Sequence, residues 1–583
     1  MASLRIFTFL LSFGTIFSIA ISQTPPTPKE LTGLWEAKKF FGPDLRGTLT
    51  IRQLNREFSA EIAGSSVPVS IHAESLFAEV KKNTLKAYFD NNRTRITGYW
   101  NQKGVGACPI TLTKNTSGVW QGEVIPWPTV ERAYLIIKRK SDGSTAVTLR
   151  NPEHNFGYTQ YRFDHLNQDG ASVKFFAADK DGKPGEMLAE GRYDSDEDVL
   201  SVYMPNRGGT YDFSRIPENG PSDIYPRGRP GVKYVYAPPL KRDDEWETAS
   251  LTDVGISRDS IEKFIQVLTD TPFDSIDAQE DHAVIIARHG KIVLEEYFHG
   301  ENAEKPHDTR SAGKSFASEM MGAAIQSGIR ISDKDFVYKI MNGGDFPENL
   351  EPRKRAMTVA HLLTMSSGFD CDEGDENSAG YEDKMWEQTG DLYKWTLELN
   401  MVRNPGEKGV YCSTGANLVA GVVSRAANQH TATLLRKLIT DPLGMKTYYQ
   451  TVAPSKEEFT FTGGAKFLLR DFLKLAQLHL NGGVWHGKRI YSREWSDRAT
   501  SELSLLGKKF NRKYGYLWWL EDYQYKGHPL RAYFAAGNGG QISMGIPELD
   551  LAVAFFGGNY NSDNTFTAQR VYVPRYILPA IIQ

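Results

Sequence analysis

Two serine–lysine pairs with a spacing of three residues stand out as groups that could carry out nucleophilic chemistry. They are Ser260–Lys263 and Ser311–Lys314. On a helix this spacing places both side chains on one face, about one turn apart. A serine hydroxyl becomes a good nucleophile when a neighbouring base takes its proton, and a desolvated lysine can be that base. Residues 257–268 have the apolar spacing of an amphipathic surface helix, which makes the first pair a poor candidate.

The residues around Ser311 favour the second pair. Apolar residues recur at helical spacing over 320–325, so Ser311 is expected at the start of a helix with a buried face. The unpaired N–H groups of a first helical turn can stabilise an oxyanion, and the small Ala312 and Gly313 leave room for a substrate. We expect burial to favour the neutral form of Lys314. The alternative is that Ser311 only caps the helix and Lys314 is exposed.

Several segments in order make the chain resemble the serine β-lactamase and penicillin-binding-protein-like hydrolases. The likeness runs from about Leu251 to the C-terminus and is greatest to the class C β-lactamase-related branch. That branch includes esterases, D-amino-acid peptidases and 6-aminohexanoate-dimer hydrolase. The resemblance implies an α+β fold with a β-lactamase-like antiparallel sheet and a helical cluster, and a Ser-x-x-Lys nucleophile. The matching segments are Ser311–Lys314, Thr358–Gly368, Tyr411–Ser413, Asp441–Met445 and Gly539–Gln541.

The second motif of such enzymes, Tyr-x-Asn, is matched by Tyr411-Cys412-Ser413. By the resemblance, Tyr411 would shuttle a proton together with Lys314, and the neighbouring ammonium would lower the pKa of the phenol. Ser413 replaces the asparagine of the family, and its shorter side chain could still donate a hydrogen bond to substrate. The alternative is that Tyr411 is a core residue, as most of the 27 tyrosines are expected to be.

The third motif, Lys-Thr-Gly or His-x-Gly, is matched by residues 535–541, which contain neither lysine nor histidine. The resemblance implies that a backbone N–H group of Gly537, Asn538, Gly539 or Gly540 completes an oxyanion hole, while a plain hairpin turn is the alternative. β-Lactams and peptidoglycan stem peptides carry a carboxylate that the missing cation would bind. We therefore expect ester or small amide hydrolysis rather than β-lactamase or D-stereospecific peptidase or carboxypeptidase activity.

Cys371 and Cys412 flank segments of the expected site, and we consider a disulfide between them that braces Tyr411. Without that bridge, Cys412 would be a small buried hydrophobic residue. The acidic residues of 370–376 are interpreted as a solvated loop, with a calcium site as the less favoured alternative. No Gly-x-Ser-x-Gly, His-Glu-x-x-His or phosphate-binding loop motif occurs. We expect no metal and no cofactor.

Length, charge and periodicity predict the domain organisation. The 583 residues carry 68 Lys and Arg against 71 Asp and Glu, a balance that argues against a nucleic-acid partner. Residues 1–22 have the features of a secretory signal peptide, with a membrane anchor as the alternative. Short strands and turns over 23–215 predict a β-rich accessory domain, or a ligand-binding barrel. A proline-rich linker is expected over 216–249 and the hydrolase domain over 250–583.

These observations predict an exported serine hydrolase, periplasmic or extracellular, that acts through an acyl-enzyme on a small-molecule ester or amide. Beyond its signal, the chain is expected to contain no membrane span. The rival hypothesis from another class is a catalytically silent cell-envelope binding protein whose β-domain contacts a cell-wall or polysaccharide partner.

Overall fold

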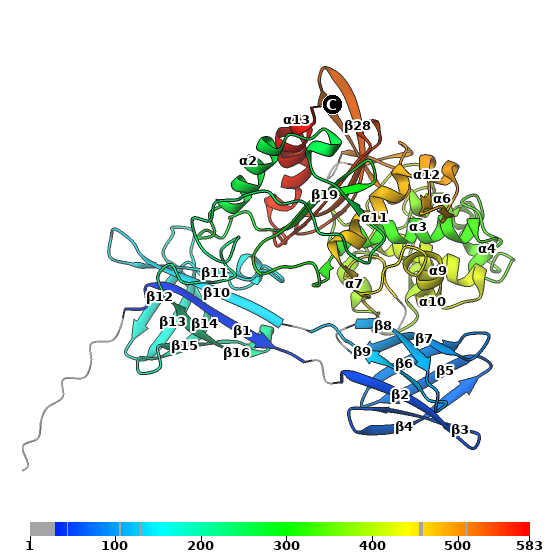
Figure 1. Cartoon of the computed structure of the whole chain (residues 1–583), viewed down its shortest axis with the longest axis horizontal. Helices are drawn as coiled ribbons and strands as arrows, with labels where there is room; N and C mark the ends of the chain where they lie inside the picture. The colour runs from blue at the N-terminus through cyan, green and yellow to red at the C-terminus, as the bar shows by residue number, and fades with distance from the viewer. Residues whose placement is uncertain are drawn as a thin grey trace, which may run out of the picture.

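A computed structural model describes residues 30–42, 45–103, 106–128, 130–453, 459–507 and 511–582. The predicted signal peptide, Met1–Ser22, lies outside these residues. Figure 1 shows two β-barrels beside a larger domain in which helices cover a twisted sheet. In the described part of the chain, no helix is long and apolar enough to cross a membrane.

The first barrel, named here the discontinuous barrel, closes with eight strands taken from two separate stretches of chain. Its first strand pairs with β10 on one side and with β16 on the other, both antiparallel. A short helix, α1 (Phe156–Thr159), follows β11. The strands are β1 (Gly33–Phe40), β10 (Val130–Arg139), β11 (Thr145–Arg150), β12 (His165–Asp169), β13 (Ser172–Ala178), β14 (Pro184–Asp194), β15 (Val199–Met204) and β16 (Gly209–Ile216).

The second barrel, named the inserted barrel, lies between β1 and β10 in the sequence and is also closed by eight strands. Consecutive strands pair antiparallel, and β2 pairs with β9 to close the ring. The strands are β2 (Gly47–Leu54), β3 (Glu57–Ile62), β4 (Ser65–His72), β5 (Ser75–Val80), β6 (Asn83–Phe89), β7 (Arg95–Gln102), β8 (Gly106–Lys114) and β9 (Trp120–Val124).

Each barrel encloses a core of its own large side chains. Trp35, Phe156 and Phe175 are fully buried in the discontinuous barrel, and Trp100 is fully buried in the inserted one. An eight-stranded barrel is just wide enough for such side chains to fill it. The region predicted from the sequence as one β-rich domain thus contains two closed barrels. Both barrels are built from short antiparallel strands, so the same strand pattern runs through both.

The proline-rich connector after β16 packs against the catalytic domain. Tyr236 donates a hydrogen bond to the carbonyl of Val293 at 2.9 Å, and Tyr234 donates to Glu296 at 2.6 Å. Trp246, near the end of the connector, is 1% exposed. The predicted linker is not extended throughout: its first part folds into turns, where the Ser222 N–H donates to the Gly228 carbonyl at 3.0 Å. Aromatic side chains attach the rest of it to the domain.

A sheet of nine strands forms the centre of the catalytic domain, in the order β17-β19-β18-β30-β29-β28-β27-β26-β25. All neighbours are antiparallel except β17 and β19. The strands are β17 (Glu247–Thr248), β18 (Asp281–Arg288), β19 (Lys291–Tyr297), β25 (Ser504–Leu506), β26 (Arg512–Tyr514), β27 (Trp519–Tyr525), β28 (His528–Gly537), β29 (Gln541–Ile546) and β30 (Leu551–Gly557). Smaller sheets contain β20 (His307–Asp308), β21 (Tyr448–Tyr449), β22 (Lys466–Phe467), β23 (Val484–Trp485) and β24 (Lys488–Arg489).

Helices gather on both sides of this sheet (Figure 1). Helix α11 packs on β29 and β30, and α3 packs against α9 in the helical cluster. They are α2 (Arg258–Thr269), α3 (Gly313–Gln326), α4 (Val337–Met341), α5 (Pro352–Arg355), α6 (Val359–Leu363), α7 (Glu382–Trp386), α8 (Leu392–Glu398), α9 (Ser413–Ala427), α10 (Thr431–Leu435), α11 (Leu469–Leu480), α12 (Arg493–Ala499) and α13 (Leu578–Ala580).

The structure confirms the predicted α+β domain preceded by a β-rich region. Helix α2 begins after Ser257, whose hydroxyl accepts the N–H of Ser260 as an N-cap. The two-residue connection His289-Gly290 joins β18 to β19. At the C-terminus Pro574 lies inside a π-helix, Ala568–Ile577.

Candidate active site

Ser311 lies in a short 3-10 turn, Arg310–Ala312, that leads directly into α3. Lys314, in the first turn of that helix, is 1% exposed. Its Nζ donates hydrogen bonds to Ser311 Oγ at 3.0 Å and to the carbonyl oxygen of Thr462 at 2.7 Å. The spacing of three residues therefore brings the hydroxyl and the amine into direct contact, and the structure does not leave Lys314 exposed.

Burial is one of several influences on the charge state of Lys314. Desolvation acts to lower the pKa of its ammonium, as predicted, but Tyr411, Glu382 and Glu373 act in the opposite direction, and the pKa is raised overall. The expected effect of burial is therefore present but is outweighed by these neighbours. Burial alone does not set the protonation state when carboxylates from another segment share the site.

Tyr411 occupies the loop before α9 and is 9% exposed. Its ring stacks on Trp519 with 5.3 Å between ring centroids, and Lys314 Nζ lies 5.2 Å from the ring centroid. The phenol also hydrogen-bonds with the side chains of Ser311 and Lys314. Desolvation raises the pKa of the phenol more than these partners lower it. The Lys314 ammonium acts to lower the pKa of the phenol, as expected, but desolvation outweighs this effect.

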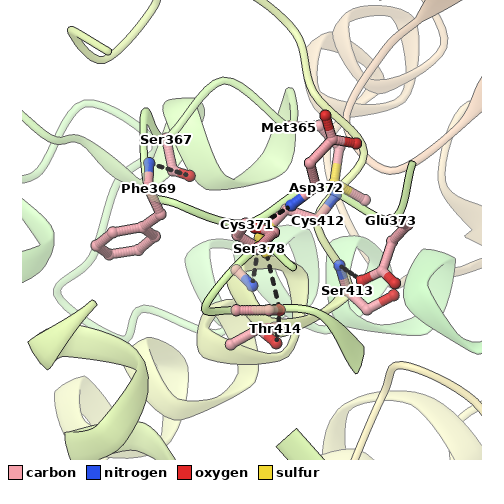
Figure 2. The surroundings of a disulfide bond; sticks show 12 residues. Met365, Ser367, Phe369, Cys371, Asp372, Glu373, Ser378, Cys412, Ser413 and Thr414 are labelled. Atoms are coloured by element: carbon pink, nitrogen blue, oxygen red, sulfur yellow. Dashed lines mark hydrogen bonds between the residues drawn. A yellow bond between two sulfur atoms is a disulfide. The ribbon is translucent and has the colours of Figure 1, made fainter. Parts of the chain in front are cut away.

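A disulfide joins Cys371 to Cys412, the residue after Tyr411, across a sequence separation of 41 residues (Figure 2). The Cys412 N–H also donates to Met365 Sδ at 3.4 Å. The bridge attaches the loop that follows Phe369 to the base of α9. In this way it fixes the backbone on the C-terminal side of Tyr411.

Two glutamates lie beside this bridge. Glu382 was not indicated by any sequence pattern, and Glu373 belongs to the acidic segment 370–376, which was predicted to be solvated, but is itself partly buried. Glu373 Oε1 accepts the backbone N–H of Ser413 at 3.0 Å, and Glu382 Oε2 accepts the Ser413 hydroxyl at 2.8 Å. Desolvation and the neighbouring Glu382 raise the pKa of Glu373. Ser413, expected to contact substrate, is fully buried and bonded to these carboxylates. Only the closeness of residue 373 to Cys371 could have indicated this acidic pair.

Helix α9 begins directly after Cys412, which has the N-cap position, with its sulfur accepting the N–H of Gly415. The hydroxyl of Thr414 donates to the carbonyl of Gly380 at 2.8 Å. The first turn of the helix is thereby attached to the loop that the disulfide holds.

Of the four candidate oxyanion residues, Gly537 packs directly against the turn that carries Ser311. A Cβ atom on Gly537 would lie 2.2 Å from the Thr309 carbonyl oxygen and 3.2 Å from the Ala312 nitrogen. Only glycine fits such a close backbone approach. In the described part of the chain, no acceptor pairs with the Ser311 N–H, which suits an oxyanion donor.

The rest of this glycine turn is held by the loop after β30. Asn538 donates to Asn561 Oδ1 at 2.6 Å, and the Asn561 N–H donates to Asn538 Oδ1 at 2.8 Å. The Gly539 carbonyl accepts the Asn559 N–H at 3.0 Å. Gly539 and Gly540 have φ angles of +97° and +100°, a backbone region that favours glycine.

A cation stands next to the nucleophile although the glycine turn contains none. Arg310, with a φ of +49°, precedes Ser311 directly. Its Nε lies 3.5 Å from Asp308 Oδ2, and its guanidinium stacks over Tyr560 at 4.7 Å. This charge is therefore partly balanced by a carboxylate of the protein itself.

The remaining candidates lie away from this centre. On α2 the Ser260 hydroxyl bonds to that of Ser257 at 3.0 Å, as a surface capping group does. Cys108 lies in the inserted barrel, where burial raises the pKa of its thiol to about 12. Within the described ranges, no group of three or more His, Cys, Asp and Glu side chains is arranged to hold a metal ion.

The geometry agrees with a comparison against known families. A family model described as "Beta-lactamase" matches residues 274–569, a stretch that contains Ser311, Tyr411 and the glycine turn. The chain belongs to the beta-lactamase family. Its sheet-and-helix domain is therefore a β-lactamase-like fold, and members of this family are serine hydrolases.

The individual proteins that this chain is similar to have low sequence identity with it. A 6-aminohexanoate-dimer hydrolase of Paenarthrobacter ureafaciens is 24% identical over 226 residues, which are 36% of this chain and 55% of that protein. The match thus spans about half the length of this relative. A putative 6-aminohexanoate-dimer hydrolase from Bacillus anthracis has 18% identity and a TM-score of 0.44, over 61% of this chain and 89% of that one. A family VIII carboxylesterase has 15% identity and a TM-score of 0.43, over 55% and 95%.

Proposed function

We propose that this member of the beta-lactamase family is an exported serine hydrolase that cleaves an ester or a small amide through an acyl-enzyme. The observation that carries the proposal is the 3.0 Å contact between Lys314 Nζ and Ser311 Oγ, made inside the domain that the family model matches. Tyr411 faces both groups. Such a contact is the geometric requirement for an activated serine.

In the proposed reaction, Ser311 Oγ forms a bond to the substrate carbonyl carbon as its proton passes to the Lys314–Tyr411 pair. The N–H of Ser311 and an N–H of the turn Gly537–Gly540 stabilise the negative oxygen of the tetrahedral intermediate. The bond to the leaving group then breaks, and the leaving group takes up the proton. Water then attacks the acyl carbon, the bond from that carbon to Ser311 Oγ breaks, and the Lys314–Tyr411 pair passes the proton of the water to Oγ, which regenerates Ser311 and releases the acid.

An ester or small amide fits this site better than a β-lactam. The glycine turn offers no cation, and the neighbouring Arg310 is already paired with Asp308 at 3.5 Å. A substrate carboxylate would have to compete with that pair. The acidic residues Glu373 and Glu382, which interact with Lys314, add further negative charge to the site.

Export is proposed from the signal-like features of residues 1–22, and the Cys371–Cys412 bridge supports an oxidising compartment. N-terminal sequencing of the protein recovered from its native host would test this part. A mature chain that begins near Gln23 is expected, and a chain that retains residue 1 in the reducing cytoplasm would contradict it.

The central test is intact mass after exposure to a fluorophosphonate. Wild type is expected to gain one adduct and Ser311→Ala none. Ser260→Ala is the matched control, since it removes the serine of the other Ser-x-x-Lys pair, and it should react as wild type does. A panel of esters, amides and β-lactams would then identify the substrate class. An unreactive wild type would favour the rival hypothesis of a silent binding protein.

A further inference from the structure

The turn between β11 and α1 of the discontinuous barrel faces the catalytic domain. Arg150 and Asn155 in this turn are 5% and 4% exposed. The Arg150 guanidinium donates to the carbonyl oxygens of Ser275 at 2.7 Å and Ala278 at 3.2 Å, and to the carboxylate of Glu280. A residue of the β-rich region thus holds the segment 275–280 of the catalytic domain, which ends at the buried Glu280, with charged and neutral hydrogen bonds.

Glu280 is bonded in turn to the loop that supports the glycine turn. Its backbone N–H donates to Asn559 Oδ1 at 2.7 Å, and Asn559 Nδ2 donates to the Glu280 carbonyl at 2.9 Å. The Asn559 N–H then donates to the carbonyl of Gly539 at 3.0 Å. A continuous set of hydrogen bonds therefore runs from Arg150 to the turn beside Ser311.

A second connection starts at Asn155. Its Nδ2 donates to the carbonyl oxygen of Tyr560 at 2.9 Å in a buried position. The Tyr560 ring lies against Gly539, where a Cβ atom would be 2.6 Å from the ring, and Arg310 stacks on the same ring. Asn155 thereby fixes Tyr560, whose ring contacts both the glycine turn, at Gly539, and Arg310, the residue before Ser311.

The glycine turn needs such support. Gly537, Gly539 and Gly540 place few restrictions on their own backbone, because glycine allows a wide range of φ and ψ. An oxyanion donor works only if it is held in place before the reaction starts. The contacts described above come from the loop after β30, and the discontinuous barrel holds that loop.

We infer that Arg150 and Asn155 are positioning residues of the active site, so that the discontinuous barrel completes the catalytic domain. This rests on the proposed function, in which the glycine turn stabilises the oxyanion. The two residues touch neither substrate nor Ser311, and act through Asn559 and Tyr560.

The test uses the full chain with Asn155→Ala, and Asn167→Ala as the matched control. Asn167 is an exposed asparagine on the same barrel. On an activated ester, kcat and the rate of fluorophosphonate labelling of Asn155→Ala should fall by about 10- to 100-fold, with KM changed by less than about twofold. The midpoints of the pH–rate profile should stay in place, because Ser311, Lys314 and Tyr411 are untouched. A folded Asn155→Ala with wild-type kcat would overturn the inference.

A second variant separates positioning from loss of folding. Arg150→Met alone leaves the Glu280 carboxylate buried without its partner, which can unfold a protein. The double variant Arg150→Met/Glu280→Gln avoids that charge and keeps the backbone contacts of residue 280. The double variant should show the same loss of kcat. Its control is Arg192→Met, which replaces an exposed arginine of the same barrel.

Hydrogen exchange gives a readout independent of activity. The backbone amides of residues 538–541 and 558–561 should exchange faster in Asn155→Ala than in wild type, while those of α3 should not change. Unchanged exchange would overturn the inference even if wild type proved inactive. An unreactive wild type with the expected exchange pattern would contradict only the proposed function.

Discussion

Asn417 Oδ1 accepts a hydrogen bond from the backbone N–H of Phe461 at 3.0 Å. Asn417 is buried on α9, one turn after Ser413, and Phe461 precedes Thr462, whose carbonyl oxygen holds Lys314. The helix that follows Tyr411 and the segment that orients the lysine are thus joined by a single side chain.

Asn417→Leu should therefore reduce kcat on an activated ester by about 10-fold or more, because the Thr462 carbonyl loses its fixed position. Asn417→Asp keeps the acceptor oxygen and should retain more activity than Asn417→Leu. Equal activities of the two variants, measured where circular dichroism shows both folded, would count against this role.

Lys314→Met should lower kcat/KM by at least about 10³-fold, since the proton of Ser311 then has no amine to receive it. Lys263→Met is the matched control, because it removes the lysine of the other Ser-x-x-Lys pair, and its activity should equal that of wild type. Steady-state kinetics on one ester check both. A Lys314→Met enzyme within tenfold of wild type would exclude this lysine from proton transfer.

The activity should rise toward alkaline pH. The pKa values of the Lys314 ammonium and the Tyr411 phenol are both raised, and the proposed base is the deprotonated form of this pair. Glu382→Gln keeps an acceptor for the Ser413 hydroxyl and removes one charge that raises the pKa of Lys314. The rising limb of its pH–rate profile, which reports the deprotonation of this base, should therefore move to lower pH. A limb that stays in place or moves upward would show that Glu382 does not act on the base.

Removing the Cys371–Cys412 bridge should cost stability. For a closed loop of 41 residues, the chain-entropy relation gives about 4 kcal/mol. A Cys371→Ala/Cys412→Ala variant should unfold at lower denaturant concentration, and dithiothreitol should have the same effect on wild type. Cys108→Ala, which leaves the bridge intact, is the control. If reduction left the unfolding midpoint of wild type unchanged, the bridge would be absent or without effect.

Acid should destabilise the contact between the discontinuous barrel and the catalytic domain. His299 and His307 are buried near it, and desolvation lowers their pKa values to about 4 and about 3. An unfolded histidine takes up its proton near pH 6.5, so the stability from keeping these rings neutral is present above that pH. It is lost as the pH falls from about 6.5 toward 3. The thermal midpoint should decrease over this range, and less so in His307→Gln. Equal pH dependence in both proteins would refute this origin.

The sequence was sufficient for features set by neighbouring residues. The contact of Ser311 with Lys314 and the amphipathic helix predicted over residues 257–268 depend on short stretches of chain. The pairing of β1 with β10, across the whole inserted barrel, leaves no local pattern. The acidic pair was missed for the same reason, since Glu373 and Glu382 approach Lys314 only after the chain folds. The sign of the pKa shift of Lys314 depended on that approach.

The register of β1 has a consequence for how the chain is assembled. Phe40, the last residue of β1, lies opposite Val130, the first residue of β10. The inserted barrel therefore leaves and re-enters the discontinuous barrel at adjacent points, where an ordinary hairpin would have a short turn. A module attached in this way can be gained, exchanged or removed while every strand pair of its neighbour stays in register.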